Sequence, residues 1–452
     1  KNATDAVDFT AGQLLSSDGA KVVGLNQADL PFTNLTQLNS FSIKNKPFAY
    51  PTWWNGHKPN LFIQNGKAVH NIDCDKFFNL SSFTPYYISP TGSDANSGLS
   101  TSLPKATLGS CLTAGAKLVY YMEGVYYRDT FLGTNRTFTD NLIVIGLGNV
   151  TLTKGQKNLV WTLGLSNTYS TSRSATDNVF DMVNTDTNGY PSRLIKATSQ
   201  ANCEATAGSW YTNGTLVYVH KIDNTIPDNN IIVSVGLSDS VLNNSGNIYF
   251  KNINFLYLGM SLLGVNSSTT LKIYQQDCKY IYSRESGALT YNSLSLDYFT
   301  DAYLVRCYSY NSTRDGLNYH NLGSIACKVT EVDCFVANAG IYDVNTNNQC
   351  STAHEGISIL RVNGSYYGGN AQVIADVNTG TKSILIGCEL NTGNEQANTI
   401  IFYGVDAVLD GCKLFGNKLI TEVDSANGGV SISNSILEVS ATTGSVTITP
   451  II

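Results

Sequence analysis

Five cysteines return at nearly regular intervals in the second half of the chain, and this spacing restricts the possible folds more than any other feature. The intervals between them are 29, 27, 54 and 24 residues, and 54 is twice 27. Small residues fill the missing step and extend the series in both directions. The predicted column comprises Asn254, Cys278, Cys307, Cys334, Gly364, Cys388, Cys412 and Ser435. Such a period is typical of a solenoid, in which each repeat stacks on the next.

The residues between these positions favour strands over helices. Short alternating, β-branched or aromatic stretches recur, as at 271–274 and 430–432, and long amphipathic helical stretches are missing from the repeats. Parallel strands coiled one turn per repeat give a β-helix with turns about 4.8 Å apart. The cysteines then stack inside as buried thiols. Because neither C-x-x-C pairs nor zinc-type Cys/His spacings occur, we expect no disulfides, no metal and no cofactor.

Composition excludes two classes of partner. Hydrophobic residues make up 42% of the 452 residues, which is ample for a core, and the net charge is −6 without any Lys/Arg run. An acidic chain of this kind does not suit nucleic acid, which requires neutralisation of phosphates. No stretch approaches the roughly 18 apolar residues of a membrane span. The first residues lack a signal-peptide core and an initiating Met, so a fragment or a processed form is left open.

The segment 86–98, Tyr-Tyr-Ile-Ser-Pro-Thr-Gly-Ser-Asp-Ala-Asn-Ser-Gly, is followed by Pro-Lys-Ala-Thr at 104–107. Together they resemble the opening of the pectate-lyase-like right-handed parallel β-helix superfamily. The resemblance implies a short capping helix near 107–114 and a first turn at 124–126. Residues 208–230 also resemble early turns of that family.

The later part of the chain resembles bacteriophage tailspike depolymerases at Asp315–His320, His354–Gly356 and Ile374–Asn378. This resemblance implies a homotrimer on a virion tail that contacts other tail proteins through its N-terminal side. It also implies action on a polysaccharide at the bacterial cell surface.

The chain is expected to divide into three parts, with one interruption. Residues 1–85 are predicted to form an N-terminal capping or anchor-proximal segment, 86–440 the right-handed, single-stranded parallel β-helix, and 441–452 a C-terminal tail. The polar stretch 166–206 is predicted to be a loop or small insertion on the coil.

The turns between 278 and 364 are longer than their neighbours and hold the densest set of ionisable residues, which marks one face as functional. Glycoside hydrolysis requires two carboxyl groups beside the bond. Glu285, Asp315 and Glu355 lie about one turn apart and are the predicted catalytic group. A neighbouring Arg lowers a carboxyl pKa, so Glu355, which has none beside it, is the expected proton donor. That these acids merely mark turns before glycine is the alternative.

The predicted substrate-binding residues are polar or aromatic side chains of the same turns: Arg284, Arg314, Tyr319, His320, His354, Arg361 and Asp376. Arg361 is expected to hold an acidic sugar or to form a structural salt bridge, and Asp376 to contribute to the site or to cap a turn. The expected function is endo-glycosidic hydrolysis of a capsular or exopolysaccharide. A lyase acting on a uronic-acid polymer and a non-catalytic carbohydrate-binding virion or adhesin protein are the alternatives.

Overall fold

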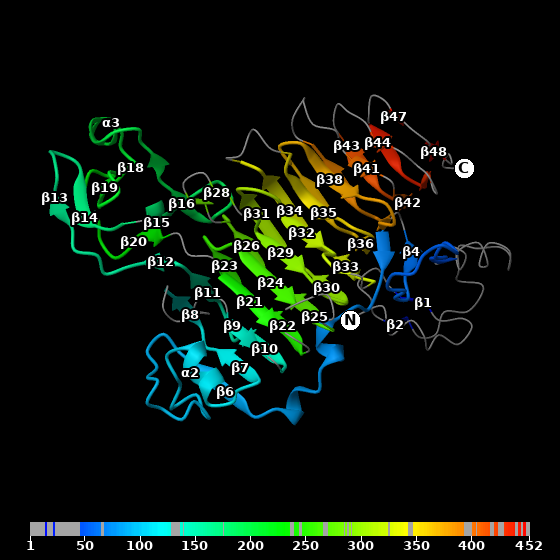
Figure 1. The fold of residues 1–452 in the computed structure, drawn as a ribbon, viewed down its shortest axis with the longest axis horizontal. Coiled ribbons are helices and arrows are strands. Elements are labelled where there is room, and N and C mark those ends of the chain that lie inside the picture. The colour runs from blue at the N-terminus through cyan, green and yellow to red at the C-terminus, as the bar shows by residue number, and fades with distance from the viewer. Residues whose placement is uncertain are drawn as a thin grey trace.

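The computed structural model describes residues 46–448, together with the short antiparallel pair β1 (Leu14–Leu15) and β2 (Lys21–Val22). The description omits residues 65–66, 128–135, 139, 175, 236–238, 244–245, 265–269, 284, 287–288, 291, 324–325, 342–346, 393–399, 404, 416–419, 424–428, 439–441 and 444–445. The described part is a parallel β-solenoid of about ten turns (Figure 1), which confirms the predicted fold class. No helix in it is long and apolar enough to cross a membrane.

Three parallel sheets form the coil; each complete turn contributes one strand to each sheet, and sheet 1 has one additional strand at each end. Sheet 1 contains β6 (Pro85–Ile88), β7 (Leu118–Tyr121), β10 (Leu142–Gly146), β22 (Asn247–Lys251), β25 (Lys272–Gln276), β30 (Asp301–Val305), β33 (Lys328–Val332), β36 (Ser358–Val362), β39 (Lys382–Ile386), β42 (Asp406–Asp410), β45 (Val430–Ser433) and β48 (Val446–Ile448). Sheet 2 contains β8 (Gly124–Tyr126), β11 (Val150–Thr153), β23 (Asn254–Leu256), β26 (Lys279–Ile281), β31 (Tyr308–Ser312), β34 (Phe335–Ala339), β37 (Ser365–Tyr367), β40 (Glu389–Asn391), β43 (Lys413–Phe415) and β46 (Ile436–Glu438). Sheet 3 contains β9 (Arg136–Phe138), β21 (Asp239–Asn243), β24 (Met260–Gly264), β29 (Leu294–Asp297), β32 (Leu317–His320), β35 (Gln349–Ala353), β38 (Gln372–Val377), β41 (Ile400–Tyr403), β44 (Ile420–Val423) and β47 (Thr442–Thr443).

The cysteine column exists as predicted, with one correction. The strands that follow the five cysteines pair in register, so their thiols lie one above another, and all ten cysteines are buried and free. Gly364 and Ser435 occupy the same position on their turns. Asn254 does not, because it pairs with Lys279 and therefore lies one residue beyond the column. The buried Ile253 takes its place, since the interior accepts an aliphatic side chain where a thiol would stack.

A left-handed backbone position precedes each member of this column and explains why the repeat is visible in the sequence. The residues are Asn252, Asp277, Arg306, Asp333, Asn363, Gly387, Gly411 and Asn434, with φ between 49° and 65°. Gly, Asn and Asp adopt this conformation at least cost. Arg306 is the one member that is not Gly, Asn or Asp. Its guanidinium forms a bidentate pair with Asp277 on the turn before, at 2.6 and 2.9 Å. The coil therefore bends at the same point on each of these turns.

The early end of the coil is closed as expected. Helix α2 (Leu108–Thr113) is capped by Thr107, whose side chain accepts from Ser110 N, and it buries Leu108 and Cys111 against the first turns. Strand β8 forms the expected first turn of sheet 2.

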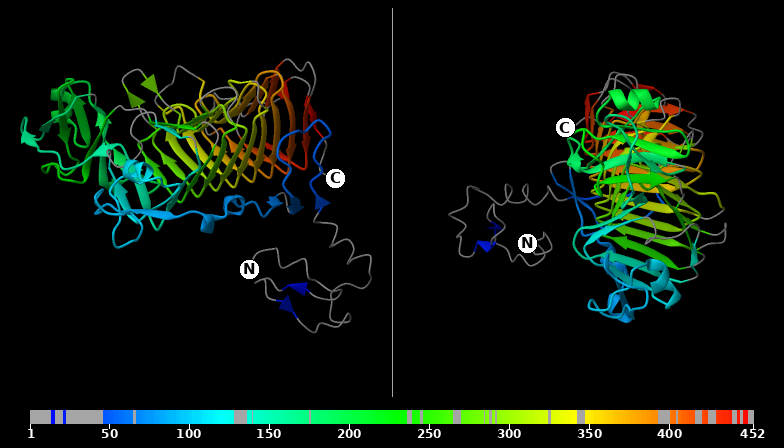
Figure 2. Two further views of the ribbon diagram at one scale, coloured as in Figure 1. Left: turned by 60° about the horizontal axis from the view of Figure 1, so that its bottom comes forward. Right: turned by 90° about the vertical axis from the view of Figure 1, so that its left-hand side faces the viewer.

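Residues 46–83, which we call the strap, cover the outer face of sheet 1. They form β3 (Lys46–Pro47), β4 (Phe62–Gln64), β5 (Lys67–Val69) and the 3₁₀ helices η3 (Cys74–Phe77) and η4 (Leu80–Ser82). From Lys67, which donates to Gly387 O at 2.8 Å, the strap passes back along the turns to Phe78, which stacks on Tyr249. Figure 2 shows this blue segment along the coil. The outer face of sheet 1 is therefore interior.

Residues 155–235 form a folded insertion between β11 and β21 (Figures 1 and 2). Its elements are β12 (Gly155–Gln156), β13 (Thr162–Leu163), β14 (Tyr169–Ser172), β15 (Thr176–Thr185), β16 (Pro191–Arg193), β17 (Ile195–Lys196), α3 (Gln200–Ala205), β18 (Ser209–Thr212), β19 (Leu216–His220) and β20 (Ile231–Val235). They make two largely antiparallel sheets around a separate core that includes Trp210 and Val217. The prediction that residues 208–230 belong to early turns is wrong, because alternation marks a strand without revealing its partner.

Candidate functional site

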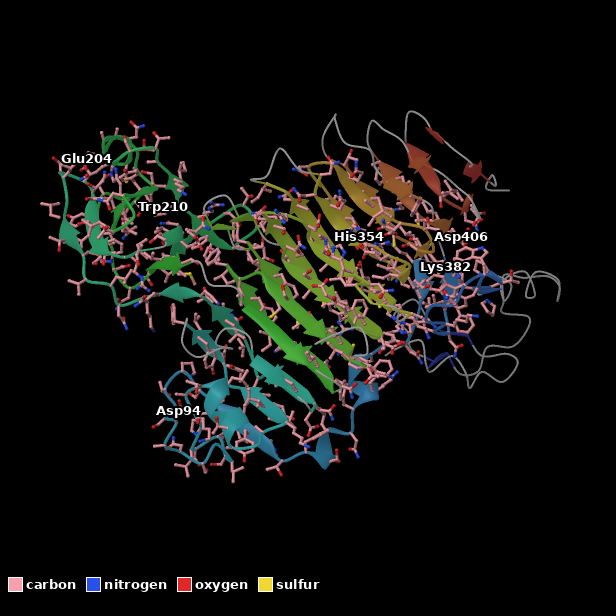
Figure 3. The ribbon with its side chains drawn as sticks, viewed as in Figure 1. Asp94, Glu204, Trp210, His354, Lys382 and Asp406 are labelled. Carbon is pink, nitrogen blue, oxygen red and sulfur yellow. The ribbon has the colours of Figure 1, made fainter. Side chains whose placement is uncertain are left out.

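Three ionisable side chains share one outward position on successive turns of sheet 3. Leu317, Tyr319 and Ala353 belong to the core, so the residues that alternate with them face outward. Asp297 of β29 pairs in register with His320 of β32, and the next turn places His354 immediately after the Tyr319–Ala353 pair. Figure 3 shows His354 near the middle of the coil, away from both ends. The sheet thus holds these three groups side by side.

His320, His354 and Glu355 converge at the end of these strands. The two imidazole rings are stacked with centroids 4.3 Å apart and planes 15° apart. Glu355 adopts a left-handed conformation with φ of 52°, and its carboxylate oxygens lie 3.1 and 3.3 Å from His320 Nδ1. The backbone N–H of Asn321 donates to Glu355 Oε2 at 3.2 Å. One ligand atom from each of the three residues lies within 4.8 Å of the others, so this set could hold a metal ion.

Asp297 is a candidate that sequence reasoning missed. Its carboxyl group is half-buried on the outer face, and burial raises its pKa, with the Glu355 charge acting in the same direction and His320 opposing it. Asp297 precedes His320 by 23 residues, the length of a short turn, and that step was the available signal. It has neither the Gly nor the His neighbours that drew attention to the other acids.

Asp315 lies toward the other end of β32. Its carboxylate accepts from Gln349 N at 2.8 Å and from Asn318 Nδ2 at 2.7 Å. Burial raises its pKa and outweighs the opposing effects of these hydrogen bonds and of Arg314. The expectation that Arg314 would leave Asp315 with a lowered pKa is therefore wrong. Arg314 itself is exposed.

His354 is held in one tautomer by its own strand. The Thr352 hydroxyl donates to Ala375 O on the next turn, so toward His354 Nε2, 3.0 Å away, it acts as an acceptor. The neutral imidazole then carries its proton on Nε2. Burial lowers the pKa of His354, and the neighbouring His320 lowers it further. A neutral imidazole at this site can accept a proton or bind a cation through Nδ1.

Three predicted substrate-binding residues lie inside the coil, where a polymer outside cannot reach them. Arg361 and Asp376 are fully buried and form a bidentate pair at 2.6 and 2.8 Å. Arg361 also donates to Ser351 and lies 3.8 Å from the buried Glu331. Tyr319 belongs to the hydrophobic core. The expectation that these residues contact sugar is therefore wrong. Arg361 and Asp376 form a structural salt bridge, the alternative considered for Arg361, and Tyr319 packs in the core.

The first of the predicted acids is only partly described. Glu285 begins β27 (Glu285–Ser286), which pairs with β28 (Leu289–Thr290), but its side chain and the whole of Arg284 lie outside the described residues. Of the three predicted catalytic carboxylates, the structure thus places Asp315 just before β32 and Glu355 just after the neighbouring strand β35.

No protein-family model and no curated protein matches this chain. Among solved structures, it is similar to one titled "Glycoside hydrolase", with 11% identity, 78% of this chain and 96% of that chain covered, and a TM-score of 0.48. A structure of XylC with xylose shares 10% identity over 77% and 69% of the two chains, with a TM-score of 0.38. The Gp54 tailspike of Acinetobacter baumannii bacteriophage AP22, in complex with capsular saccharide, shares 10% identity over 73% and 65%, with a TM-score of 0.28.

Proposed function

We propose that the protein binds a bacterial capsular or exopolysaccharide on the outer face of sheet 3 and cuts it by endo-glycosidic hydrolysis. The observation that supports this proposal is the convergence of two carboxyl groups, Asp297 and Glu355, with two histidines on successive turns. Glycoside hydrolysis uses one carboxylic acid to protonate the leaving oxygen and a second carboxylate as nucleophile or base. Both groups are half-exposed, so a polymer lying along the coil can reach them.

The two carboxyl groups have different surroundings, which suggests their roles. Burial raises the pKa of Asp297, and we assign it as the proton donor. Glu355 accepts hydrogen bonds from Asn321 N and His320 Nδ1, which hold its carboxylate in one orientation. It therefore acts as the nucleophile or activates water, and His320 orients it. This assignment replaces the expectation that Glu355 is the acid.

Asp315 is assigned a supporting role. Both of its oxygens accept hydrogen bonds from groups of the same face, Gln349 N and Asn318 Nδ2. Asp315 thereby positions these polar groups next to the two proposed catalytic groups. Asn318 itself is buried.

The test compares Asp297→Asn and Glu355→Gln with the matched control Asp406→Asn, which alters a half-buried acid of sheet 1. Each site variant should lose about 3–6 kcal/mol of transition-state stabilisation, roughly a hundred-fold to ten-thousand-fold in rate. The readout is the release of reducing ends from purified capsule, with polymer binding measured in parallel. Binding should survive in both variants, because the amides keep the shape of the acids.

Near-normal turnover in both site variants would contradict the assignment. New chain ends that absorb in the ultraviolet would indicate elimination by a lyase. Unchanged polymer length with the wild-type protein would indicate a binding protein without catalysis.

We also propose that three copies associate on a virion tail, attached through the N-terminal side and acting at the cell surface. This proposal rests on the resemblance of residues 315–320 and 354–356 to tailspikes. Sedimentation equilibrium should give three times the chain mass of 48.8 kDa. A mass of one chain at micromolar concentration would contradict it.

A further inference from the structure

We propose that His320, His354 and Glu355 bind one divalent transition-metal ion of the zinc class. The sequence predicts no metal, because short-range zinc spacings are missing. The coil brings donors together by another route, from neighbouring turns. The proposal concerns residues of the proposed catalytic face, but ion binding does not require that this face be catalytic.

The donor atoms are already close to ligand spacing. Ligands held about 2.0–2.2 Å from one zinc ion lie roughly 3–4 Å from each other. His320 Nδ1 and Glu355 Oε2 are 3.1 Å apart, and the widest separation in the set of three is within 4.8 Å. A shift of about 1 Å therefore closes the set around an ion. The stacked imidazoles can make this shift by tilting about their side-chain torsions while the strands stay fixed.

The surroundings of the donors are organised as a ligand set requires. The Thr352 hydroxyl accepts a hydrogen bond from His354 Nε2–H. The lone pair of His354 Nδ1 is then the one that can bind a metal ion. Asn321 N fixes one Glu355 oxygen, and Asn378 Oδ1 accepts from Glu355 N at 3.3 Å. Such outer contacts set the tautomer and orientation of metal-binding side chains. Backbone pairing between β32 and β35 holds the two histidines at a constant separation.

The chemistry of the set selects the class of ion. Two imidazoles and one carboxylate suit zinc and related transition metals better than calcium or magnesium, which prefer oxygen ligands. The side chains of His320 and Glu355 are 30% and 37% exposed, so an ion can enter from solvent. Three protein ligands leave at least one position for water or a sugar oxygen. Asp297, one turn before His320, is a further carboxylate on this face.

A bound ion and the proposed acid–base chemistry exclude one another. The ion would take Glu355 and His320, which the proposed hydrolysis needs free. Zinc should therefore inhibit the release of reducing ends, and a chelator should restore it.

The test uses Co²⁺ as the probe, because its visible absorption reports ligand geometry without any assay of activity. The purified full chain should bind one Co²⁺ per molecule, and Zn²⁺ should displace it. His354→Ala and Glu355→Gln should weaken binding at least about tenfold. The matched control is His70→Ala, which removes a histidine of the strap, bound to Asp333 at 3.0 Å. Circular dichroism verifies that each variant is folded.

The proposal is overturned if the wild-type chain shows no Co²⁺ absorption, or if both site variants bind as tightly as His70→Ala. Loss of binding in the site variants alone supports it. Because the spectrum does not depend on turnover, a chain that binds Co²⁺ but releases no reducing ends keeps the metal site and loses the proposed hydrolysis.

Discussion

A charged residue inside the coil has a different meaning from one on its surface, and Arg361 shows why. Strand β36 is apolar on both faces, because Leu360 and Val362 point outward into the core formed with the strap while Ile359 points inward. Arg361 shares the inward side with Ile359 and meets Asp376 and Glu331 there. From the sequence, an Arg among aliphatic residues looks like the exposed member of the strand. The structure reverses this interpretation, because the strap covers sheet 1 and buries the outward side chains of β36, so that Arg361 can face inward.

Replacing Arg361 by Ala should lower the free energy of unfolding by about 3–5 kcal/mol, because it leaves buried carboxylates without their partner. Denaturant unfolding followed by circular dichroism measures this. Replacing all three charged partners, Arg361→Met with Asp376→Leu and Glu331→Gln, should recover much of the loss, since no charge then remains in this part of the core. Equal loss in the single and triple variants would show that these charges are not the source of the stability.

The thiol column offers a second test of burial. Cys307 is 1% exposed and lies between Cys278 and Cys334. Cys307→Asp should cost several kcal/mol, about 2–7, unless the group is protonated, and Cys307→Ser about 1–3 kcal/mol. Thermal melting compares the two. An Asp variant that melts like the wild type would mean that the column faces solvent.

At the scale of elements, the strap has an acid-sensitive attachment. His57 lies between Asp301, 2.9 Å from Nε2, and Thr330, 2.9 Å from Nδ1, and it stacks on Tyr303. Burial lowers the pKa of His57, and the hydrogen bond and charge of Asp301 offset only part of this, while Lys328 and Lys272 act with burial. For Asp301, burial alone would raise the pKa, but His57 and Lys272 together lower it.

The sign of the pH dependence follows from these two directions. The unfolded chain protonates His57 near pH 6.5, whereas the folded chain resists, so stability is complete above 6.5 and falls as pH decreases below it. Asp301 contributes a further loss only below its ordinary value of 3.8. The protection factors of amides in residues 46–83, which correct for the pH dependence of the intrinsic exchange rate, should therefore be lower at pH 5 than at pH 7. In His57→Gln this difference should shrink, and an unchanged difference would assign it to another group.

The insertion should behave as a separate unit. Trp210 is fully buried in its own core. Trp210→Ala should cost about 3–5 kcal/mol locally. Hydrogen exchange should rise across residues 155–235, while the coil keeps its protection and any hydrolytic activity. A matching loss of protection in sheet 2, where Tyr257 and Tyr282 pack on Phe180 of the insertion, would show that the two fold as one.

The extent of successful prediction differs between elements for a physical reason. The turns could be predicted because a left-handed bend constrains a single residue, and Asn363 or Gly411 displays that constraint locally. The strap and the insertion could not, because the alternation that makes a strand does not name its partner. Of the site, His320, His354 and Glu355 were visible through spacing and residue type. Asp297 was not, since its importance comes only from its neighbour one turn later.

At the scale of the whole molecule, regular stacking gives the chain a fixed order. Each turn contacts the turns before and after it, and the site occupies the middle of the described coil, where neighbours on both sides hold it. Side chains from separate turns therefore meet without help from long loops. Because each turn of the coil contacts only its neighbours, it is the strap that connects residues early in the sequence with the late turns.

That arrangement has a consequence for biosynthesis. Lys67 donates to Gly387 O, and Trp53 O accepts from Lys382, so these strap residues find their partners only after more than 300 further residues have emerged from the ribosome. Until then the apolar outer side of sheet 1, with Val332, Leu360 and Ile384, has no cover. A ribosome-bound chain would thus expose a growing apolar face of sheet 1. The strap residues that cover this face are already synthesised but cannot yet bind to it. The strap is made before the coil, but its attachment to the late turns is completed last.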